Sequence, residues 1–346
     1  MIVKADDLFA FLQKVSLEKI DGFSEIILPV KPKYSKNGDT FFSTMSVDAN
    51  FILDSYRTVD PVKVLFYLVR EQMLSENKEV KKRIIVGVKQ CDLKALEVID
   101  TALINKDFID PRYKLWRENT IIISSDCGKI GENCYCNLMD GKPYAQKGFD
   151  VNLSRINDCY LMEAGSQKGK QFLEMVKKHI NYSDAQNTDA VQVQTNRGKV
   201  VSELEQKNSN LAVNREYINL RMSEMQVWKD ESLNCVGCGS CTNICPTCYC
   251  LILNDETEAQ KFVKVRSYDS CQYNGYARVA GGGTPRPKMF ERFRNRYLCK
   301  FLYMKSNFDI YGCTGCGRCT ETCPGKINFM KAVKNIIENK AESVQQ

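Results

Sequence analysis

The chain has 346 residues with a formal net charge of +7 at pH 7, a charge too small to indicate a nucleic-acid partner by itself. It holds 17 cysteines but a single histidine, His179, which argues against His-ligated metal centres and Ser-His-Asp catalysis. No apolar run reaches the length of a membrane span, and the first 15 residues lack the features of a signal peptide, so we expect a cytoplasmic protein whose cysteines serve metal or redox chemistry.

Strand and helix patterns alternate over residues 1–197 and predict an α/β domain. Strands are expected at 26–30, 41–45, 83–88 and 120–124, and a hairpin at 151–156 and 160–164. Helices are expected at 1–15, at 61–73, at 93–103, and from a cap at Ser166 to about residue 180.

Four cysteines follow two buried strands of this domain. Cys91 comes just after the strand at 83–88, and Cys127 comes just after the strand at 120–124, with Cys134 and Cys136 close behind. In open α/β sheets, ligands gather beyond the carboxyl ends of the strands, so neighbouring strands would bring these thiols to one edge. They form a complete ligand set for a [4Fe–4S] cluster, here called quartet 3. The alternative is that they are ordinary buried small apolar residues.

The segment after this domain is a predicted connection. Residues 181–197 are mostly polar and indicate a loop, and residues 200–228 contain few helix breakers and predict a helix. We therefore expect a helical linker over residues 198–230, before the remaining cysteines begin.

Two copies of one cysteine pattern follow, each with the spacing C-x2-C-x2-C-x3-C-P. This spacing is the ligand run of bacterial two-cluster ferredoxins, in which the fourth cysteine of each run binds the other cluster. Quartet 1 is therefore expected to be Cys235, Cys238, Cys241 and Cys323, and quartet 2 to be Cys313, Cys316, Cys319 and Cys245, each on its own [4Fe–4S] cluster. Zinc is the alternative metal, but zinc sites favour two separated cysteine pairs.

These runs predict a bacterial two-cluster ferredoxin-like α+β domain over residues 231–330, with a large insertion at 251–305 between the motifs and a helical tail at 331–346. A further set, quartet 4, consists of Cys248, Cys250, Cys271 and Cys299. The segment 248–250 repeats the Cys-Tyr-Cys order of residues 134–136. Quartet 4 predicts a fourth cluster or, alternatively, structural thiols packed around the first two. Only Cys159 is left outside the four quartets.

The insertion also contains three glycines at 281–283 and a basic run interleaved with aromatic residues. Its basic residues are Arg286, Lys288, Arg292, Arg294, Arg296 and Lys300. The glycines are not followed by the Gly-Lys-Ser/Thr of a phosphate loop, and no strand is followed by G-x-G-x-x-G, so we expect no flavin or NAD in this chain. The basic run could bind nucleic acid, but charges that offset anionic clusters or meet an acidic partner are the more economical interpretation.

Together these stretches resemble the iron–sulfur electron-transfer subunits of cytoplasmic redox complexes, namely the beta subunits of nickel–iron sulfhydrogenases and the iron–sulfur electron-transfer subunit of the anaerobic sulfite reductase. The resemblance covers most of the chain. It rests on both cysteine runs and on residues 87–96, 133–136, 245–250, 269–271 and 280–282. Relatives are expected to have a histidine where Cys299 stands, which leaves the ligands of a fourth cluster open.

The resemblance implies a relay of single electrons between two partners. One would be a flavin-bearing NAD(P)H or ferredoxin oxidoreductase subunit, and the other a catalytic metalloenzyme subunit, either a hydrogenase or a sulfite or sulfur reductase. Two other hypotheses stay open: a catalytic reductase of thiol, disulfide or sulfur substrates at an extra cysteine-ligated cluster, and an iron–sulfur protein that binds nucleic acid. No paired carboxylates or nucleophile–base motif mark a substrate site in this chain.

Overall fold

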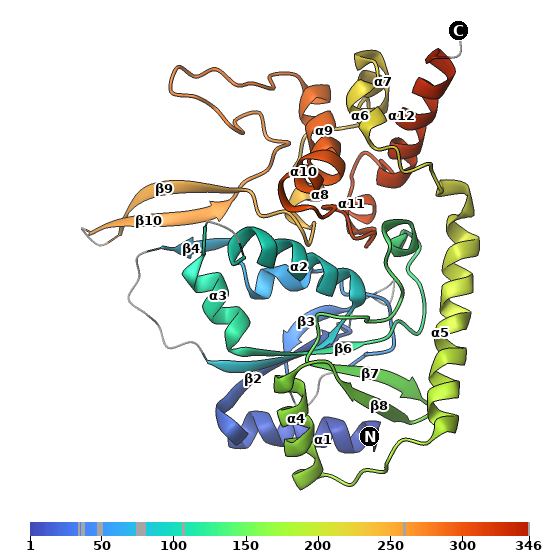
Figure 1. Cartoon of the computed structure of the whole chain (residues 1–346). Helices are drawn as coiled ribbons and strands as arrows, with labels where there is room; N and C mark the ends of the chain where they lie inside the picture. The colour runs from blue at the N-terminus through green and yellow to red at the C-terminus, as the bar shows by residue number, and fades with distance from the viewer. Residues whose placement is uncertain are drawn as a thin grey trace.

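The computed structural model describes residues 1–33, 35, 39–46, 51–73, 81–105, 108–258 and 261–344. Its main sheet has seven strands in the order β1-β8-β7-β6-β5-β2-β3 (Figure 1). They are β1 (Ile2–Lys4), β2 (Phe23–Val30), β3 (Phe41–Thr44), β5 (Lys82–Val88), β6 (Thr120–Ser125), β7 (Val151–Ile156) and β8 (Cys159–Ala164). The central strands β2, β5, β6 and β7 are parallel, and the outer strands pair antiparallel.

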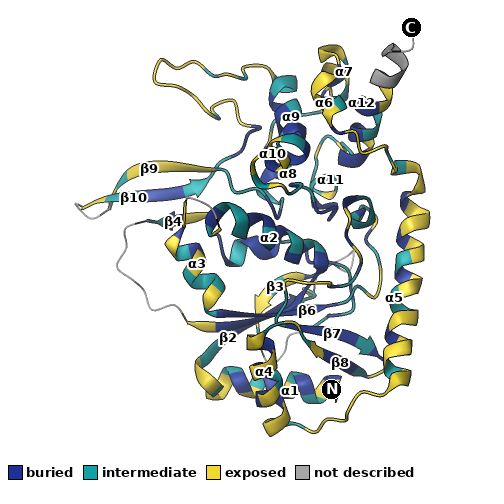
Figure 2. Ribbon diagram, in the orientation of Figure 1, coloured by how far each residue is buried: buried dark blue, intermediate teal, exposed yellow. Residues whose placement is uncertain are grey.

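Helices cover both faces of this sheet, which explains why its central strands are apolar on both sides (Figure 2). On β5, Ile84 and Val86 pack with α1 (Ala5–Glu18) and α4 (Gln167–His179) on one face. Ile85 packs with α2 (Gln90–Leu103) and α3 (Pro111–Glu118) on the other face, and so does Val88, which follows an irregularity in the strand register after Val86. The predicted α/β sheet region is confirmed.

A long helix, α5 (Asn187–Asn208), runs beside the sheet towards the C-terminal part (Figure 1). That part is mainly helical, with α6 (Ile218–Met222), α7 (Met225–Glu231), α8 (Ser240–Asn243), α9 (Met289–Leu298), a π-helical turn at Cys299–Tyr303, α10 (Met304–Phe308), α11 (Arg318–Glu321) and α12 (Phe329–Val344). Its core is aromatic: the Tyr297 ring stacks on Phe329 at 4.4 Å and meets Trp228 edge-on at 5.6 Å.

A second, three-stranded sheet joins the two parts of the chain. Its order is β4-β10-β9, with β4 (Arg70–Gln72), β9 (Leu251–Glu258) and β10 (Lys261–Tyr268). The buried Arg266 on β10 forms ion pairs with Glu71 on β4 and with Asp110 at the start of α3. The β9–β10 hairpin therefore projects from the body of the protein but is fixed to its N-terminal part at one end (Figure 1).

The predicted helix at 61–73 is wrong. The segment has a short 3₁₀ turn at Val62–Leu65 and then the strand β4. Tertiary contacts override its helical pattern: Lys63 donates to the carbonyls of Asn243 and Cys248, and the Val69 carbonyl accepts from the backbone of Tyr268.

The predicted loop at 181–197 is also wrong from residue 187 onward, where α5 begins behind a capping box of Gln186 and Asp189. Its buried stripe is narrow, with Val193, Val200 and Leu204, so the segment has the composition of a loop. The helix expected at 200–228 ends at residue 208, and α6 and α7 follow as separate short helices.

The hairpin at 151–164 and the Ser166 cap of α4 are confirmed. Among the described residues, no helix is both long and apolar enough to cross a membrane.

Candidate functional site

Quartet 3 surrounds one cavity at the carboxyl edge of the main sheet. Strands β5 and β6 are parallel neighbours, as the prediction required. Cys91 lies in the first turn of α2, directly after β5, and the loop after β6 carries Cys127, Cys134 and Cys136. All four line a hollow with about 380 Å³ of atom-free space, part of it open to solvent.

The wall of this cavity is strongly basic. Arg57, Lys89, Lys129 and Lys142 line it, and none of the described residues that line it is a carboxylate. Lys89 is buried, and its Nζ donates to the Leu53 carbonyl at 2.6 Å, the Ser125 hydroxyl at 2.8 Å and the Asp126 carbonyl at 2.8 Å. An ammonium fixed in this way stabilises negative charge at the sulfur atoms of Cys127 and Cys91.

Burial shifts the pKa values of two thiols of quartet 3, Cys127 and Cys91. Burial raises the pKa of Cys127 to about 11, against the opposing effect of Lys89. Burial also raises the pKa of Cys91 well above its ordinary value, and the charge of Asp92 adds to the effect. A metal that binds here must displace these protons, so binding and deprotonation are coupled.

Quartet 1 surrounds a second cavity, in the C-terminal part. All four of its cysteines line a hollow with about 490 Å³ of atom-free space, partly open to solvent, whose walls include Phe293, Tyr297 and Phe329. Burial raises the pKa of Cys241 to about 12, while the buried Arg296 opposes the shift. The first run enters this cavity through Gly237 and Gly239, which have positive φ angles of 65° and 73°.

Quartet 2 lies between these two cavities. Its Cys316 lines the cavity of quartet 3, and its Cys319 lines the cavity of quartet 1. Burial raises the pKa of Cys316 to about 12, and the neighbouring Cys245 and Cys319 contribute to that shift. Desolvation raises the pKa of the partly buried Cys313, and the same two thiols contribute. These charge effects link Cys313 and Cys316 to the other two members of quartet 2.

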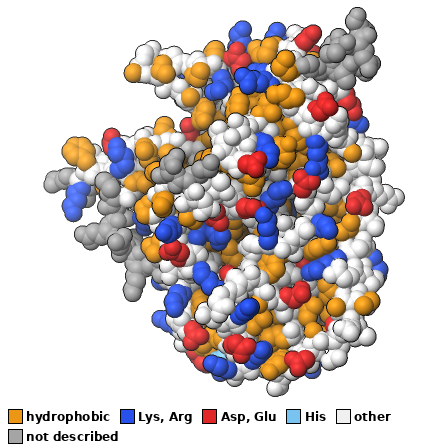
Figure 3. Space-filling view, viewed as in Figure 1, with side chains coloured by type: hydrophobic (Ala, Val, Ile, Leu, Met, Phe, Trp, Pro, Cys, Tyr) orange, Lys and Arg blue, Asp and Glu red, His pale blue; other side chains and the backbone are white. Residues whose placement is uncertain are grey.

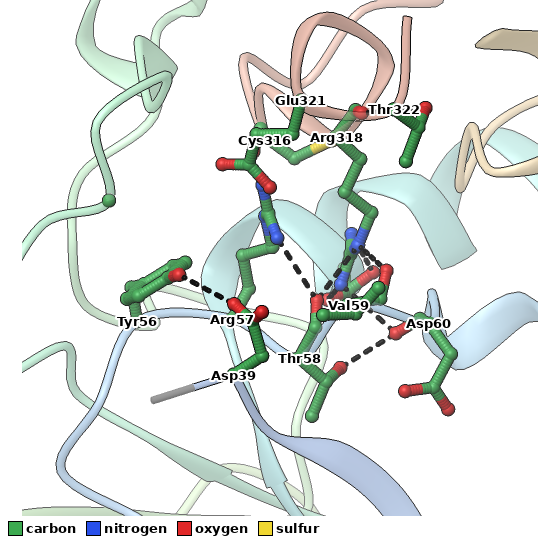
Figure 4. Close-up of polar contacts among 12 residues, drawn as sticks. Asp39, Tyr56, Arg57, Thr58, Val59, Asp60, Cys316, Arg318, Glu321 and Thr322 are labelled. Atoms are coloured by element: carbon green, nitrogen blue, oxygen red, sulfur yellow. Dashed lines mark hydrogen bonds and ion pairs between the residues drawn. The ribbon is translucent and has the colours of Figure 1, made fainter. Parts of the chain in front are cut away.

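The loop of the second run is fixed to the N-terminal part by two buried arginines (Figure 4). Arg318 donates two hydrogen bonds to Asp92, at 2.9 and 2.8 Å, and the side chains of both residues are no more than 1% exposed. Arg318 also donates to the carbonyls of residues 58–60. Arg57 donates to the Cys316 carbonyl at 2.8 Å and pairs with Glu321 at 2.5 Å.

Glycines let this loop touch the loop of quartet 3 directly. A Cβ atom on Gly315 would lie 2.5 Å from Cα of Cys136, and one on Gly317 would lie 2.1 Å from the carbonyl oxygen of Asn133. The backbone of Tyr135 also donates to the Gly315 carbonyl at 2.8 Å. Quartets 2 and 3 are thus held on two backbones in direct contact.

Quartet 4 is only partly assembled. Burial raises the pKa of Cys250 to about 11, and the charges of Cys271 and Cys299 contribute to that shift. The Cys250 sulfur also lies 3.9 Å from the Tyr276 hydroxyl. The backbone of Cys248 donates to the Cys245 carbonyl of quartet 2 at 3.3 Å. The interaction of the two thiols lowers the pKa of Cys245 and raises that of Cys248, to which Cys250 also contributes.

Within the described ranges, no three His, Cys, Asp or Glu side chains converge on a point that one metal ion could occupy. The cysteines of quartets 1 and 3 instead stand apart around hollows. Four thiolates around a hollow are the donor set and arrangement that a cubane cluster requires, so these residues fit such a group.

The basic run of the insertion turns largely inward. Arg292, Arg296 and Lys300 are buried. Arg292 donates to the carbonyls of residues 272, 286 and 287, and Lys300 donates to the Thr247 hydroxyl at 2.5 Å beside Cys245. On the face shown in Figure 3, basic and acidic side chains are interspersed. The sequence did not point to the buried cations Arg57, Lys63, Lys89 and Arg318, because a lone cation in a sequence carries no sign of its burial.

Comparison with known proteins agrees with this geometry. Residues 234–327 match the family described as a 4Fe-4S dicluster domain. The chain is 32% identical over 298 residues to sulfhydrogenase 2 subunit beta of Pyrococcus furiosus, an alignment that covers 83% of this chain and 85% of that protein. No solved structure matches the chain. The chain belongs to the iron–sulfur beta-subunit family of the sulfhydrogenases, as the resemblance indicated.

Proposed function

We propose that this chain is the electron-transfer subunit of a multi-subunit oxidoreductase and that quartets 1, 2 and 3 each hold a [4Fe–4S] cluster. The contiguity of the three quartets supports the proposal best, since quartet 2 lends Cys319 to one neighbouring cavity and Cys316 to the other. When bound, such clusters supply one-electron oxidation and reduction with little change of geometry.

The residues of the chain have three tasks in this proposal. The cysteines supply thiolates at fixed positions, and the aromatic walls around quartet 1 limit the access of water. The buried cations Lys89, Arg57, Arg296 and Lys300 stabilise the negative charge that accumulates on the thiolates. The protein thus positions the clusters and tunes their electrostatic surroundings, while the redox chemistry belongs to the cofactor.

The partners we propose are a flavin-bearing NAD(P)H or ferredoxin oxidoreductase subunit and a catalytic metalloenzyme subunit. The similar protein is by name one subunit, beta, of a sulfhydrogenase. The isolated chain should therefore fail to oxidise NADH or NADPH with a viologen dye. Robust turnover by the chain alone would contradict the relay.

The number of clusters tests the proposal directly. The full-length chain, purified anaerobically, should contain about twelve iron atoms for three clusters. The variants Cys127→Ala and Cys238→Ser should each lose about four of them, whereas Cys159→Ala in β8 should lose none. About eight iron atoms in the wild type, with no loss in Cys127→Ala, would reduce quartet 3 to core packing.

Quartet 4 supports a second candidate function. Cys271 and Cys299 both contribute to the raised pKa of Cys250, whereas the largest effect on the pKa of Cys248 comes from Cys245 of quartet 2. A fourth cluster held by three thiolates would leave one coordination position for a thiol, disulfide or sulfur substrate. Reduction of such a substrate by the isolated chain with an artificial donor, abolished by Cys250→Ala, would support this function. Absence of turnover in a chain that holds about sixteen iron atoms would leave quartet 4 as a further relay site.

A further inference from the structure

Tyr135 occupies an unusual position between two quartets. It stands between Cys134 and Cys136 of quartet 3, yet it belongs to the buried aromatic cluster of the C-terminal part. Tyr217 and Phe329 are members of the same cluster. Tyr135 is 3% exposed, so its hydroxyl must find a partner inside the protein.

That partner is a cysteine of quartet 2. The Tyr135 hydroxyl lies 3.4 Å from the Sγ of Cys313. A cluster ligand is a thiolate, which carries no proton, so in the loaded protein the hydroxyl is the donor and the sulfur the acceptor. The backbone bond from Tyr135 to the Gly315 carbonyl holds the ring in place, two residues from that sulfur.

We propose that Tyr135 couples quartet 3 to quartet 2 and tunes the latter: its hydroxyl bonds to the Cys313 sulfur and makes the reduction potential of the quartet 2 cluster less negative. This inference rests on the proposed function, because it requires a cluster at quartet 2. A donated hydrogen bond draws negative charge from the ligand sulfur, which favours the reduced and more anionic state of the cluster.

Tyr135 also links the two sites physically. The path from Cys134 or Cys136 to Cys313 crosses one residue of backbone, the tyrosine side chain and one hydrogen bond. Besides tuning, Tyr135 therefore provides a short connected route between two sets of sulfur ligands whose cysteines are far apart in the sequence.

The second Cys-Tyr-Cys segment provides a matched control. Tyr249 lies between Cys248 and Cys250, but its carbonyl oxygen is the atom that accepts a hydrogen bond, from the Tyr67 hydroxyl at 3.1 Å. Among the described residues, no hydrogen bond joins the Tyr249 hydroxyl to a sulfur atom. A Tyr→Phe change removes the same oxygen atom at both positions, but it removes a bond to sulfur only at Tyr135.

The test is a redox titration of the full-length, anaerobically reconstituted protein, followed by electron paramagnetic resonance, with iron counted in each sample. Tyr135→Phe should keep its iron and shift one cluster to a more negative potential. We expect a change of about tenfold in that one-electron equilibrium, which corresponds to about 59 mV. Tyr249→Phe should leave every potential unchanged.

Two results would overturn the inference: an unshifted potential in Tyr135→Phe with its full iron content, or an equal shift in Tyr249→Phe. A wild-type chain without iron at quartet 2 would overturn the proposed function as well, which separates the two failures. If Tyr135→Phe loses iron, 3-fluorotyrosine placed at position 135 answers the question, because it keeps the hydroxyl and is a stronger donor. The potential should then become less negative, and no change would refute the proposal.

Discussion

The two Cys-Tyr-Cys segments have the same local sequence order and different surroundings. The first, residues 134–136, is closed between the two parts of the chain: Tyr135 is buried and its neighbours touch Gly315 and Gly317. The second, residues 248–250, leads into the projecting β9–β10 hairpin, and Tyr249 is only half-buried. The thiols that act on its two flanking cysteines differ: Cys245 of quartet 2 acts on Cys248, and Cys271 and Cys299 act on Cys250.

This difference shows that the Cys-Tyr-Cys sequence alone does not determine whether its two cysteines face the same cavity. In the first segment the opposing loop of the second run presses on the backbone and leaves the cysteines facing one cavity. In the second segment Lys63 holds the Cys248 carbonyl at 2.9 Å, and the two cysteines face different neighbours. The packing of a distant loop decides whether such a segment assembles a quartet.

The largest expected effect comes from the ion pair that fixes the opposing loop. Arg318→Met leaves Asp92 buried and unpaired, which should cost about 3–5 kcal/mol of unfolding free energy and release iron from quartets 2 and 3. The control is Arg215→Met, since Arg215 and Asp140 form an exposed pair that should contribute under about 1 kcal/mol. Denaturant unfolding and iron counts measure both. Equal stability of the two variants would show that the ion pair fixing the loop of the second run does not hold the cysteines of the first segment in place.

A smaller effect should follow from separating the two loops. In Gly317→Ala the new methyl group would overlap the Asn133 carbonyl at a φ of 73°, which should cost about 2–3 kcal/mol and loosen quartet 3. Gly198→Ala in α5 is the control: it has open space around it and should gain about 0.5–1 kcal/mol. Thermal unfolding of both variants measures the difference. A neutral Gly317→Ala would mean that the close approach is not needed.

A mutation at the contacts of the second segment should reduce the stability of the protein less, and quartet 3 should keep its iron. Lys63→Met removes two hydrogen bonds, to the carbonyls of Asn243 and Cys248, and should cost about 1–2 kcal/mol. Iron in quartet 3 should stay constant, because the carbonyls that Lys63 binds belong to residue 243 of the first run and residue 248 of the second segment. Loss of iron from quartet 3 in this variant would break the distinction between the segments.

The smallest effect depends on pH. Asp60 accepts from the Phe42 backbone, and its carbonyl accepts from Arg318 beside the first segment. Burial raises the pKa of its carboxyl to about 6, above the ordinary 3.8. The folded state therefore favours the protonated form of the Asp60 carboxyl. The stability that this preference contributes is complete below about pH 4 and is lost as the pH rises through 6.

Asp60→Asn, which stays neutral, should accordingly be more stable than the wild type by roughly 1–2 kcal/mol at pH 8 and equal to it near pH 4. Thermal unfolding at the two pH values measures this change. An offset that is the same at both pH values would show that ionisation of Asp60 is not its cause.

Local patterns predicted the parts of the site that depend on strand order. Because Cys91 and Cys127 directly follow two buried strands, the pairing of β5 with β6 was enough to bring these two members of quartet 3 to one edge of the sheet. The helix expected at 61–73 failed because its partners, residues 243, 248 and 268, lie far along the chain. The bond from Tyr135 to Cys313 spans 178 residues and leaves no local trace in the sequence.

The pairing of β4 with β10 also has a consequence for protein synthesis. Glu71 leaves the ribosome 195 residues before its partner Arg266, which at roughly 5–20 residues per second is an interval of about 10–40 s. During that time β4 lacks its strand partner β10, and Glu71 can pair with Arg112 but not with Arg266. The N-terminal part therefore cannot complete the three-stranded sheet until the hairpin has been synthesised. A chaperone that shields the edge of β4 would raise the yield of folded chain.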